Sequence, residues 1–115
     1  MIVDSNIAWL DPWGAVSEPR AAKLEEELGR ELASGHVLFG RRAKALAVRC
    51  DCDDVLFELC DPTQLAIVHL GWAVHPELPP CPRTELYSDL ADFVERSMKP
   101  DHLDYIDEAA QPIGV

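Results

Sequence analysis

Four apolar residues recur at spacings of three and four near the beginning of the chain: Ala21, Leu24, Leu28 and Leu32. This spacing places them in one stripe along an α-helix. Ser17 suits the N-cap of that helix and Pro19 suits its first turn. Gly35 supplies the left-handed backbone that commonly follows a helix. The pattern therefore predicts a helix over residues 18–34.

The middle of the chain changes to the period of two that is typical of β-strands. We expect strands over residues 43–50, 55–60 and 64–74. The connections at residues 51–54 and 61–63 are rich in turn-forming residues and too short for a helical crossover. The three strands should therefore pair antiparallel as a meander. The third strand is apolar on both sides, which indicates a covered strand.

A second helix is predicted towards the end of the chain. Four apolar residues line one of its faces: Leu90, Phe93, Val94 and Met98. Ser88 suits the N-cap, and Pro100 is expected to end the helix. We therefore predict a helix over residues 89–98, followed by an acidic tail over residues 101–115 that is partly ordered at best.

The order of these elements predicts an α+β fold of the type α-β-β-β-α. A three-stranded antiparallel meander would carry the N-terminal and the C-terminal helix on one shared face. The other face would need cover from an apolar arm over residues 1–16, from a proline-rich loop over residues 75–86, or from a second copy in a homodimer. At 115 residues, the chain is predicted to be a single domain, residues 1–115.

The chain is strongly acidic. Ten Lys and Arg residues stand against 21 Asp and Glu residues, which gives a net charge of −11. Such a charge repels nucleic acid and anionic membranes and attracts a basic protein partner. The simpler interpretation is that the charge keeps the protein soluble.

No apolar run in the sequence approaches the roughly 18 residues needed to cross a membrane. The first ten residues also lack the basic start of a signal peptide, so we expect a cytoplasmic protein.

The cysteines and the central aspartates are the candidates for a metal site. The four cysteines are Cys50, Cys52, Cys60 and Cys81, and in the cytoplasm their thiols stay reduced. Cys50 and Cys52 have one residue between them, whereas paired zinc ligands usually have about two to four. Asp51, Asp53 and Asp54 lack the spacing of a calcium loop and suit the local hydrogen bonds of a turn. We therefore predict no metal site and no cofactor.

A histidine inside the third strand is the main candidate for ligand binding. Together with the proline-rich loop, it suggests a pocket at the sheet edge that is lined by His69, Trp72, His75, Glu77, Arg83 and Glu85. Such a histidine can transfer a proton or bind a ligand, although more often it is a hydrogen-bonded core residue. Arg83 and Glu85 can equally form surface ion pairs of little energetic weight.

Two tryptophans, Trp9 and Trp13, lie in the predicted apolar arm. Tryptophans in a loop usually cover the edge of a core, and the alternative is an exposed partner-binding site. The sequence contains no glycine-rich phosphate loop, no nucleophile elbow and no metalloprotease motif. No catalytic residue is therefore predicted.

Five short segments stand out together: DDVLFEL at 53–59, AIVHLGW at 66–72, PRTELY at 82–87, FVE at 93–95 and MKPDH at 98–102. Together they resemble a group of small bacterial proteins. The resemblance covers about half of the chain and implies a bacterial, cytosolic origin. It implies no activity and identifies no functional residue. In size, acidity and α+β make-up the chain is also similar to immunity proteins, which neutralise toxins.

Two classes of function follow from the sequence. The first is a protein-interaction module, immunity-like or regulatory, that binds a basic partner; it explains the charge and the absence of catalytic motifs. The second is a small enzyme or small-molecule-binding protein with a pocket near His69 and the loop over residues 75–86. We favour the first, and a deep pocket at His69 would favour the second.

Overall fold

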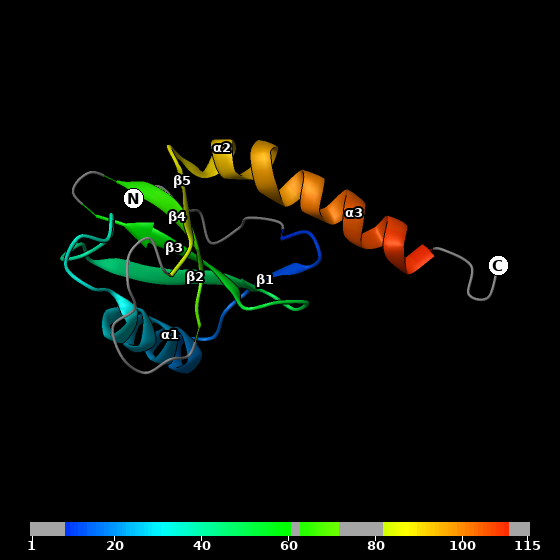
Figure 1. Ribbon diagram of the computed structural model, residues 1–115. Helices are drawn as coiled ribbons and strands as arrows, with labels where there is room; N and C mark the ends of the chain where they lie inside the picture. The colour runs from blue at the N-terminus through cyan, green and yellow to red at the C-terminus, as the bar shows by residue number, and fades with distance from the viewer. Residues whose placement is uncertain (1–8, 61–62, 72–81, 111–115) are drawn as a thin grey trace.

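The computed structural model describes residues 9–60, 63–71 and 82–110 of the chain. In chain order, its elements are β1 (Trp13–Ala15), α1 (Glu18–Glu31), β2 (Ala43–Arg49), β3 (Asp54–Leu59), β4 (Gln64–His69), β5 (Thr84–Tyr87), α2 (Leu90–Phe93), the π-helical turn η1 (Val94–Met98) and α3 (Lys99–Ala110). The strands form one antiparallel sheet in the order β1-β2-β3-β4-β5 (Figure 1).

The predicted α+β class and antiparallel meander are confirmed, but the sheet has five strands instead of three. Trp13–Ala15, expected in an irregular arm, pairs with β2 as β1. Thr84–Tyr87, expected in the proline-rich loop, pairs with β4 as β5. Both edge strands are too short to show a period of two, and their conformation is set by the strand beside them.

The helices cover opposite faces of the sheet, so the prediction of one shared face is wrong (Figure 1). On one face, Leu24 and Leu28 of α1 pack against the buried side chains of Phe57 and Val68. The core of the other face consists of Trp13, Ala47, Leu56, Leu65, Ile67, Tyr87, Phe93 and Met98. We expected the second face to be covered by the apolar arm, the proline-rich loop or a homodimer; it is covered within the chain by the C-terminal helix together with Trp9, Leu10 and Trp13 of the arm. Each central strand is apolar on both sides because each side has its own cover.

The C-terminal helix continues beyond Pro100, where we expected it to end. Proline lacks an amide hydrogen and its ring crowds the carbonyl group of the fourth residue before it. The preceding turn, η1, is widened: the N–H of Lys99 donates to the carbonyl of Val94, five residues earlier. A widened turn of this kind lets a helix absorb such a disruption. As a result, the first ten residues of the predicted tail belong to α3.

We expect the substitution Phe93→Ala to destabilise the protein strongly. The ring of Phe93 is fully buried and makes edge-to-face contacts with Trp13 and Tyr87, at centroid distances of 5.2 and 5.8 Å. Its removal leaves a cavity between the C-terminal helix and the sheet, so the free energy of unfolding should fall by about 3–5 kcal/mol.

The matched control is Phe39→Ala, because the side chain of Phe39 is 54% exposed. This substitution should change the free energy of unfolding by less than about 0.5 kcal/mol. Urea denaturation measures both variants. Equal losses of stability in the two variants would contradict the packing of the C-terminal helix on the second face.

Candidate functional site

One end of the sheet carries a row of polar side chains on the face that the C-terminal helix covers. Asp54 of β3 is paired with His69 of β4, and the N–H of His69 donates to the carbonyl of Arg83. Directly opposed residues of antiparallel strands project to the same face. Asp54 of β3, His69 of β4 and Arg83, which directly precedes β5, therefore lie side by side.

A β-bulge adds Arg49 to this row. Ala45 is paired with Phe57, but Ala47 is paired with Leu56, so the register shifts between the two alanines. The extra residue places Ala45 and Ala47 in the cores of opposite faces, whereas alternate residues of a regular strand share one face. Arg49, two residues further, consequently projects to the face of the polar row instead of the face of α1.

These side chains line a cleft of about 300 Å³ between the sheet and the beginning of α3. Ile67 contributes an apolar position to its lining, and Glu85, paired with Ile67, lies on the neighbouring strand. Ser97 and Asp101 complete the lining from the helical side. The cleft is thus a mixed site, with guanidinium, imidazole and carboxylate groups around a small apolar patch.

His69 and Asp54 form a carboxylate–imidazole pair in this cleft. Nδ1 of His69 is 2.8 Å from Oδ1 of Asp54, and the side chain of His69 is 45% exposed. With Nδ1 held by the carboxylate, Nε2 is the ring nitrogen that can exchange a proton with a bound molecule. Within the described parts of the chain, no hydroxyl or thiol group is hydrogen-bonded to Nε2, so the pair has no activated nucleophile there.

The two arginines of the cleft differ in whether their guanidinium groups are free to bind a ligand. Arg49 makes two hydrogen bonds to Asp51, at 2.9 and 2.8 Å, and an ion pair with Asp101 at 3.3 Å. The hydrogen bond to Asp51 is the main reason why the pKa of Arg49 is raised above its ordinary value. Arg83 is exposed and has no ion pair with any other described residue. Arg83 is therefore the guanidinium group that can receive an anion.

Tyr87 and Glu85 form a second polar pair beside the cleft. The hydroxyl of Tyr87 donates to Oε2 of Glu85 at 2.8 Å. Burial, reinforced by this hydrogen bond, raises the pKa of Tyr87 to about 12. Tyr87 consequently remains a neutral donor at physiological pH, and its hydrogen bond helps to hold the Glu85 carboxylate at the edge of the cleft.

The structure brings together three of the six residues predicted for ligand binding, namely His69, Arg83 and Glu85. The other three, Trp72, His75 and Glu77, lie outside the described residues. Sequence reasoning missed Arg49, Asp54, Ser97 and Asp101. Asp54 was assigned to the turn although β3 begins there, and continuing the alternation of the strand by one residue would have placed it on the face of Leu56.

The two tryptophans cover a core edge and do not form an exposed patch. Trp13 is 1% exposed and belongs to the core, so its ring offers no surface to a partner. Trp9 is partly buried, and its ring lies 6.4 Å from that of Phe93. Trp13 is therefore excluded as an exposed partner-binding residue, whereas Trp9, which is partly exposed, stays a candidate.

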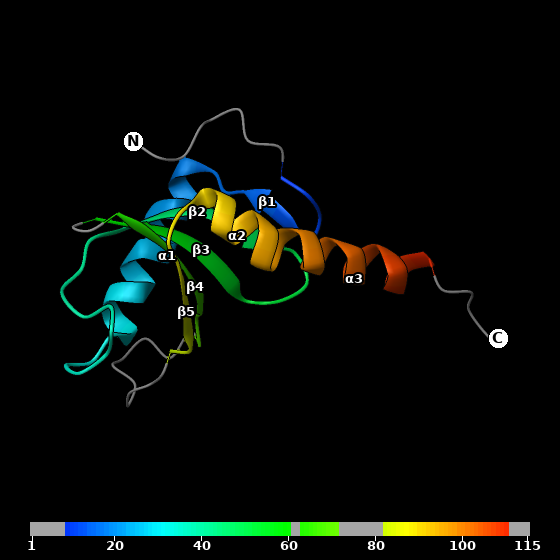
Figure 2. The ribbon, with the colours of Figure 1, turned by 90° about the horizontal axis from the view of Figure 1, so that it is seen from above.

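Helix α3 extends beyond the sheet and is held to the rest of the protein along one side (Figure 2). Asp101, at its beginning, accepts hydrogen bonds from the indole N–H of Trp13 at 3.0 Å and from the hydroxyl of Ser97 at 2.9 Å. At the next residue, Nδ1 of His102 donates to the carbonyl of Asp11 at 2.7 Å. Together with the ion pair between Asp101 and Arg49, these bonds set the direction in which α3 leaves the sheet.

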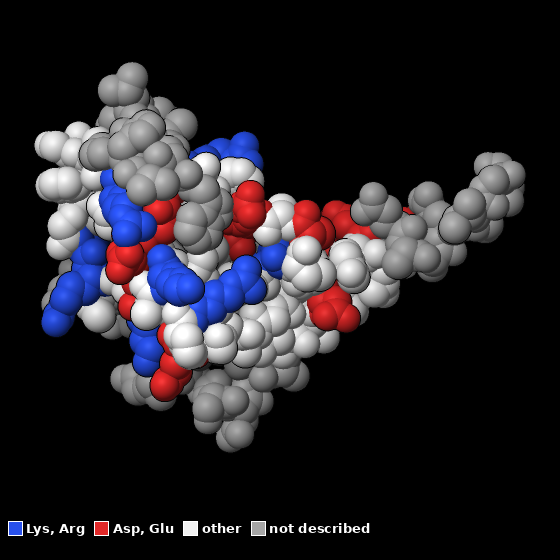
Figure 3. Space-filling view, turned by 90° about the horizontal axis from the view of Figure 1, so that it is seen from below, with Lys and Arg blue, Asp and Glu red and all other residues white. Residues whose placement is uncertain are grey.

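The net charge is divided unevenly along the chain. Residues 1–49 contain seven basic and seven acidic side chains, whereas residues 50–115 contain three basic and 14 acidic ones, so the second part carries the whole net charge of −11. In Figure 3 the Lys and Arg side chains that are visible lie over the body of the protein, among acidic ones, and the projecting part of α3 shows acidic and uncharged side chains.

The described residues hold no group of three His, Cys, Asp or Glu side chains arranged to bind a metal ion. Cys50, Cys52 and Cys60 are exposed free thiols, and Cys81 lies outside the described residues. No helix in the described ranges combines the length and the apolar character required to span a membrane.

Comparison with protein-family models, curated proteins and solved structures finds no match to this chain.

We expect Asp101→Ala to weaken the attachment of α3. The substitution removes an acceptor shared by three groups, which should lower the free energy of unfolding by about 1–3 kcal/mol. The control Asp107→Ala gives the same gain in helix propensity at an exposed position without a described partner. Urea denaturation gives the stabilities, and amide hydrogen exchange should show faster exchange in α3 of the first variant. Indistinguishable variants would contradict the role of Asp101.

Proposed function

We propose that the protein is a protein-interaction module that binds a basic partner, in the manner of an immunity protein or a regulatory binder. The observation that carries this proposal is the unbalanced negative charge of α3. Asp104 and Asp107 lie on the projecting helix, and neither forms an ion pair with a described residue. An unpaired carboxylate at the surface is free to interact with a cation from another molecule.

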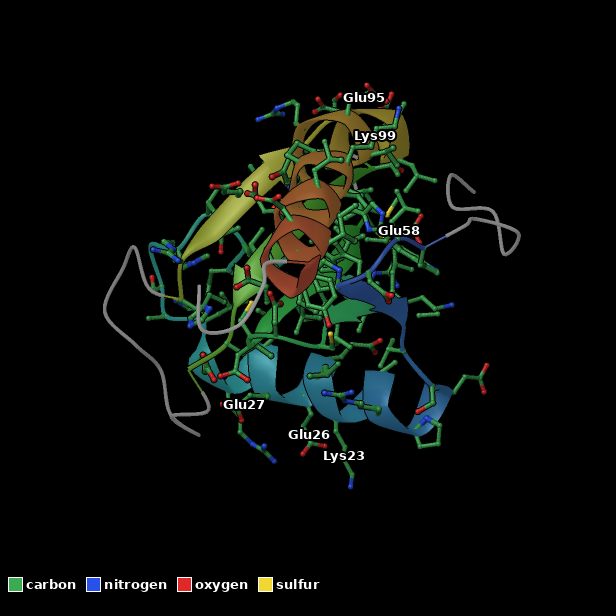
Figure 4. All side chains as sticks on the ribbon, turned by 90° about the vertical axis from the view of Figure 1, so that its right-hand side faces the viewer. Lys23, Glu26, Glu27, Glu58, Glu95 and Lys99 are labelled. Carbon is green, nitrogen blue, oxygen red and sulfur yellow. The ribbon has the colours of Figure 1, made fainter. Side chains whose placement is uncertain are left out.

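Nearby cations are already paired, which leaves these carboxylates without an internal counter-charge. Lys99 is paired with Glu95, and Arg96 with Asp92, each one helical turn apart. Figure 4 shows Glu95 and Lys99 together on the side of the helix that is turned away from the sheet. On α1, Arg30 is likewise paired with Glu26. Pairs of this kind contribute little stability, but they neutralise the surface on which they lie.

The position of α3 supports the same proposal. A charged helix that projects from the rest of the protein presents its field to an approaching partner with little interference from the arginines over the sheet. Complementary charge speeds association and disfavours partners of the same sign. Binding should therefore weaken as salt increases, because exposed charges are screened over a distance of about 10 Å at 0.1 M ionic strength.

The double substitution Asp104→Asn with Asp107→Asn tests this proposal. The wild-type protein, immobilised and exposed to lysate of its host, should retain basic proteins at about 0.05 M salt and lose them at about 0.5 M. The double variant should retain several-fold less at low salt, because two unpaired charges are removed. Quantitative mass spectrometry of the retained proteins measures the change.

The control neutralises two carboxylates away from α3, with Glu18→Gln on α1 and Asp53→Asn in the turn between β2 and β3; both are exposed, and neither forms an ion pair with a described residue. It changes the net charge by the same amount, so it should leave retention within about twofold of wild type if the location of the charge matters. Retention that is insensitive to salt, or equal in the two double variants, would contradict the proposal.

The cleft favours a second candidate function, the binding of a small molecule that carries a carboxylate or phosphate group. Arg83 is available for the anionic group, and Nε2 of His69 can exchange a proton with a neighbouring polar group.

Thermal shift measurements with a panel of small carboxylates and phosphate esters test whether the cleft binds such molecules. A ligand that raises the melting temperature of wild type should fail to do so with His69→Gln and with Arg83→Gln, while Arg42→Gln, outside the cleft, should behave as wild type. A ligand shift that survives both substitutions would exclude the cleft.

A further inference from the structure

We infer that Leu103 and Ile106 of α3 form the docking surface for a basic, amphipathic helix of the partner. This inference rests on the proposed function, and it names the surface that binds and the chemistry of the segment that is bound. It follows from the arrangement of side chains around α3, from their exposure, and from the sign of the charges beside them.

The side chains of α3 divide into three sectors around the helix, since successive residues are about 100° apart. Asp101 and His102 lie in the sector that contacts the rest of the protein. Tyr105 lies in the same sector, with its hydroxyl 3.7 Å from the thiol of Cys50. The next sector contains Leu103 and Ile106, and the sector after that contains Asp104 and Asp107. The apolar pair is therefore bordered by the attachment side on one flank and by carboxylates on the other.

Leu103 and Ile106 are two large apolar side chains that are exposed to solvent on the same side of α3. Their exposed fractions are 61% and 44%, and together with the two neighbouring aspartates they line an open, shallow hollow on α3. Their spacing of three residues is that of one half of a helix–helix seam, in which a partner helix inserts its own apolar side chains. A second helix lying along α3 would remove both side chains from water.

The charges beside the apolar pair determine what kind of helix fits. A partner helix whose apolar stripe is flanked by Lys or Arg would place those cations opposite Asp104 and Asp107. A second copy of this chain would instead place two acidic flanks close to each other, and like charges across an interface are unfavourable. Charge complementarity therefore favours a basic partner over a homodimer through α3.

The attachment of α3 prepares this surface before binding. The bonds of Asp101 and His102 fix the attachment side against β1 and β2. The apolar pair then faces solvent in a defined direction, so less conformational freedom is lost when a partner binds.

The inference is tested with two synthetic peptides of about 15 residues, long enough to form a helix on binding. Both are composed of Leu and Lys; one has Leu at helical spacing and the other is a scrambled sequence of the same composition. The isotope-labelled full chain is titrated with each peptide and followed by amide NMR. We expect the amphipathic peptide to shift signals of residues 99–107 and to bind more tightly than the scrambled peptide.

Two serine double variants give the decisive comparison. Leu103→Ser with Ile106→Ser should weaken binding of the amphipathic peptide at least about tenfold and abolish its advantage over the scrambled peptide. Val37→Ser with Phe39→Ser removes an equally exposed apolar pair, with exposed fractions of 59% and 54%, and should leave both affinities unchanged. Unchanged binding by the Leu103/Ile106 variant would overturn the inference.

The asparagine variant Asp104→Asn with Asp107→Asn separates this inference from the proposed function. If it weakens both peptides while the Leu103/Ile106 variant weakens neither, the acidic surface binds basic partners and the apolar seam does not, so the inference alone fails. If neither variant weakens binding, both fail. Sedimentation equilibrium supplies a last test: a wild-type dimer that the Leu103/Ile106 variant converts to a monomer would identify a second copy as the occupant and overturn the inference.

Discussion

The architecture depends on one constraint: the central strands are apolar on both sides, so both faces of the sheet must be removed from water. Leu56 and Leu65 are fully buried on one face, and Phe57 and Val68 on the other. One helix can cover only one face of the sheet, so α1 covers one face and the C-terminal helix covers the other. The place where α3 leaves the sheet, and with it both candidate surfaces, follows from that second packing.

Much of the fold could be predicted from the sequence because its longer elements repeat their pattern several times. The stripe of α1 and the alternation of β2, β3 and β4 are local signals, and these elements begin within one residue of the expected positions, although α1 and β4 end earlier than expected. The edge strands carry no comparable signal, since residues 13–15 and 84–87 become strands only when a neighbour is present to pair with them. Pro100 was misleading for a local reason: η1 widens the helix just before it.

The candidate site was only partly predictable because it depends on register. His69, Arg83 and Glu85 could be placed near one another from the order of the segments. Arg49 could not, because a bulge at Leu46 decides which face it joins, and a strand with regular alternation would have placed it beside α1. Asp101 could not be assigned to the site either, since the segment that contains it was expected to be a loosely ordered tail.

Asp101 connects the two candidate surfaces: it lines the cleft, and it attaches the helix that carries Leu103 and Ile106. Its carboxylate lines the cleft, and one oxygen of that carboxylate, Oδ2, bonds to Trp13, Ser97 and Arg49. These three bonds anchor α3. A molecule in the cleft that competed for this oxygen would loosen the helix, and a partner that held the helix in place would strengthen the bonds of Asp101 beside the cleft. If both surfaces bind the ligands proposed for them, occupancy of one and affinity at the other are coupled in free energy, and the coupling acts equally in both directions.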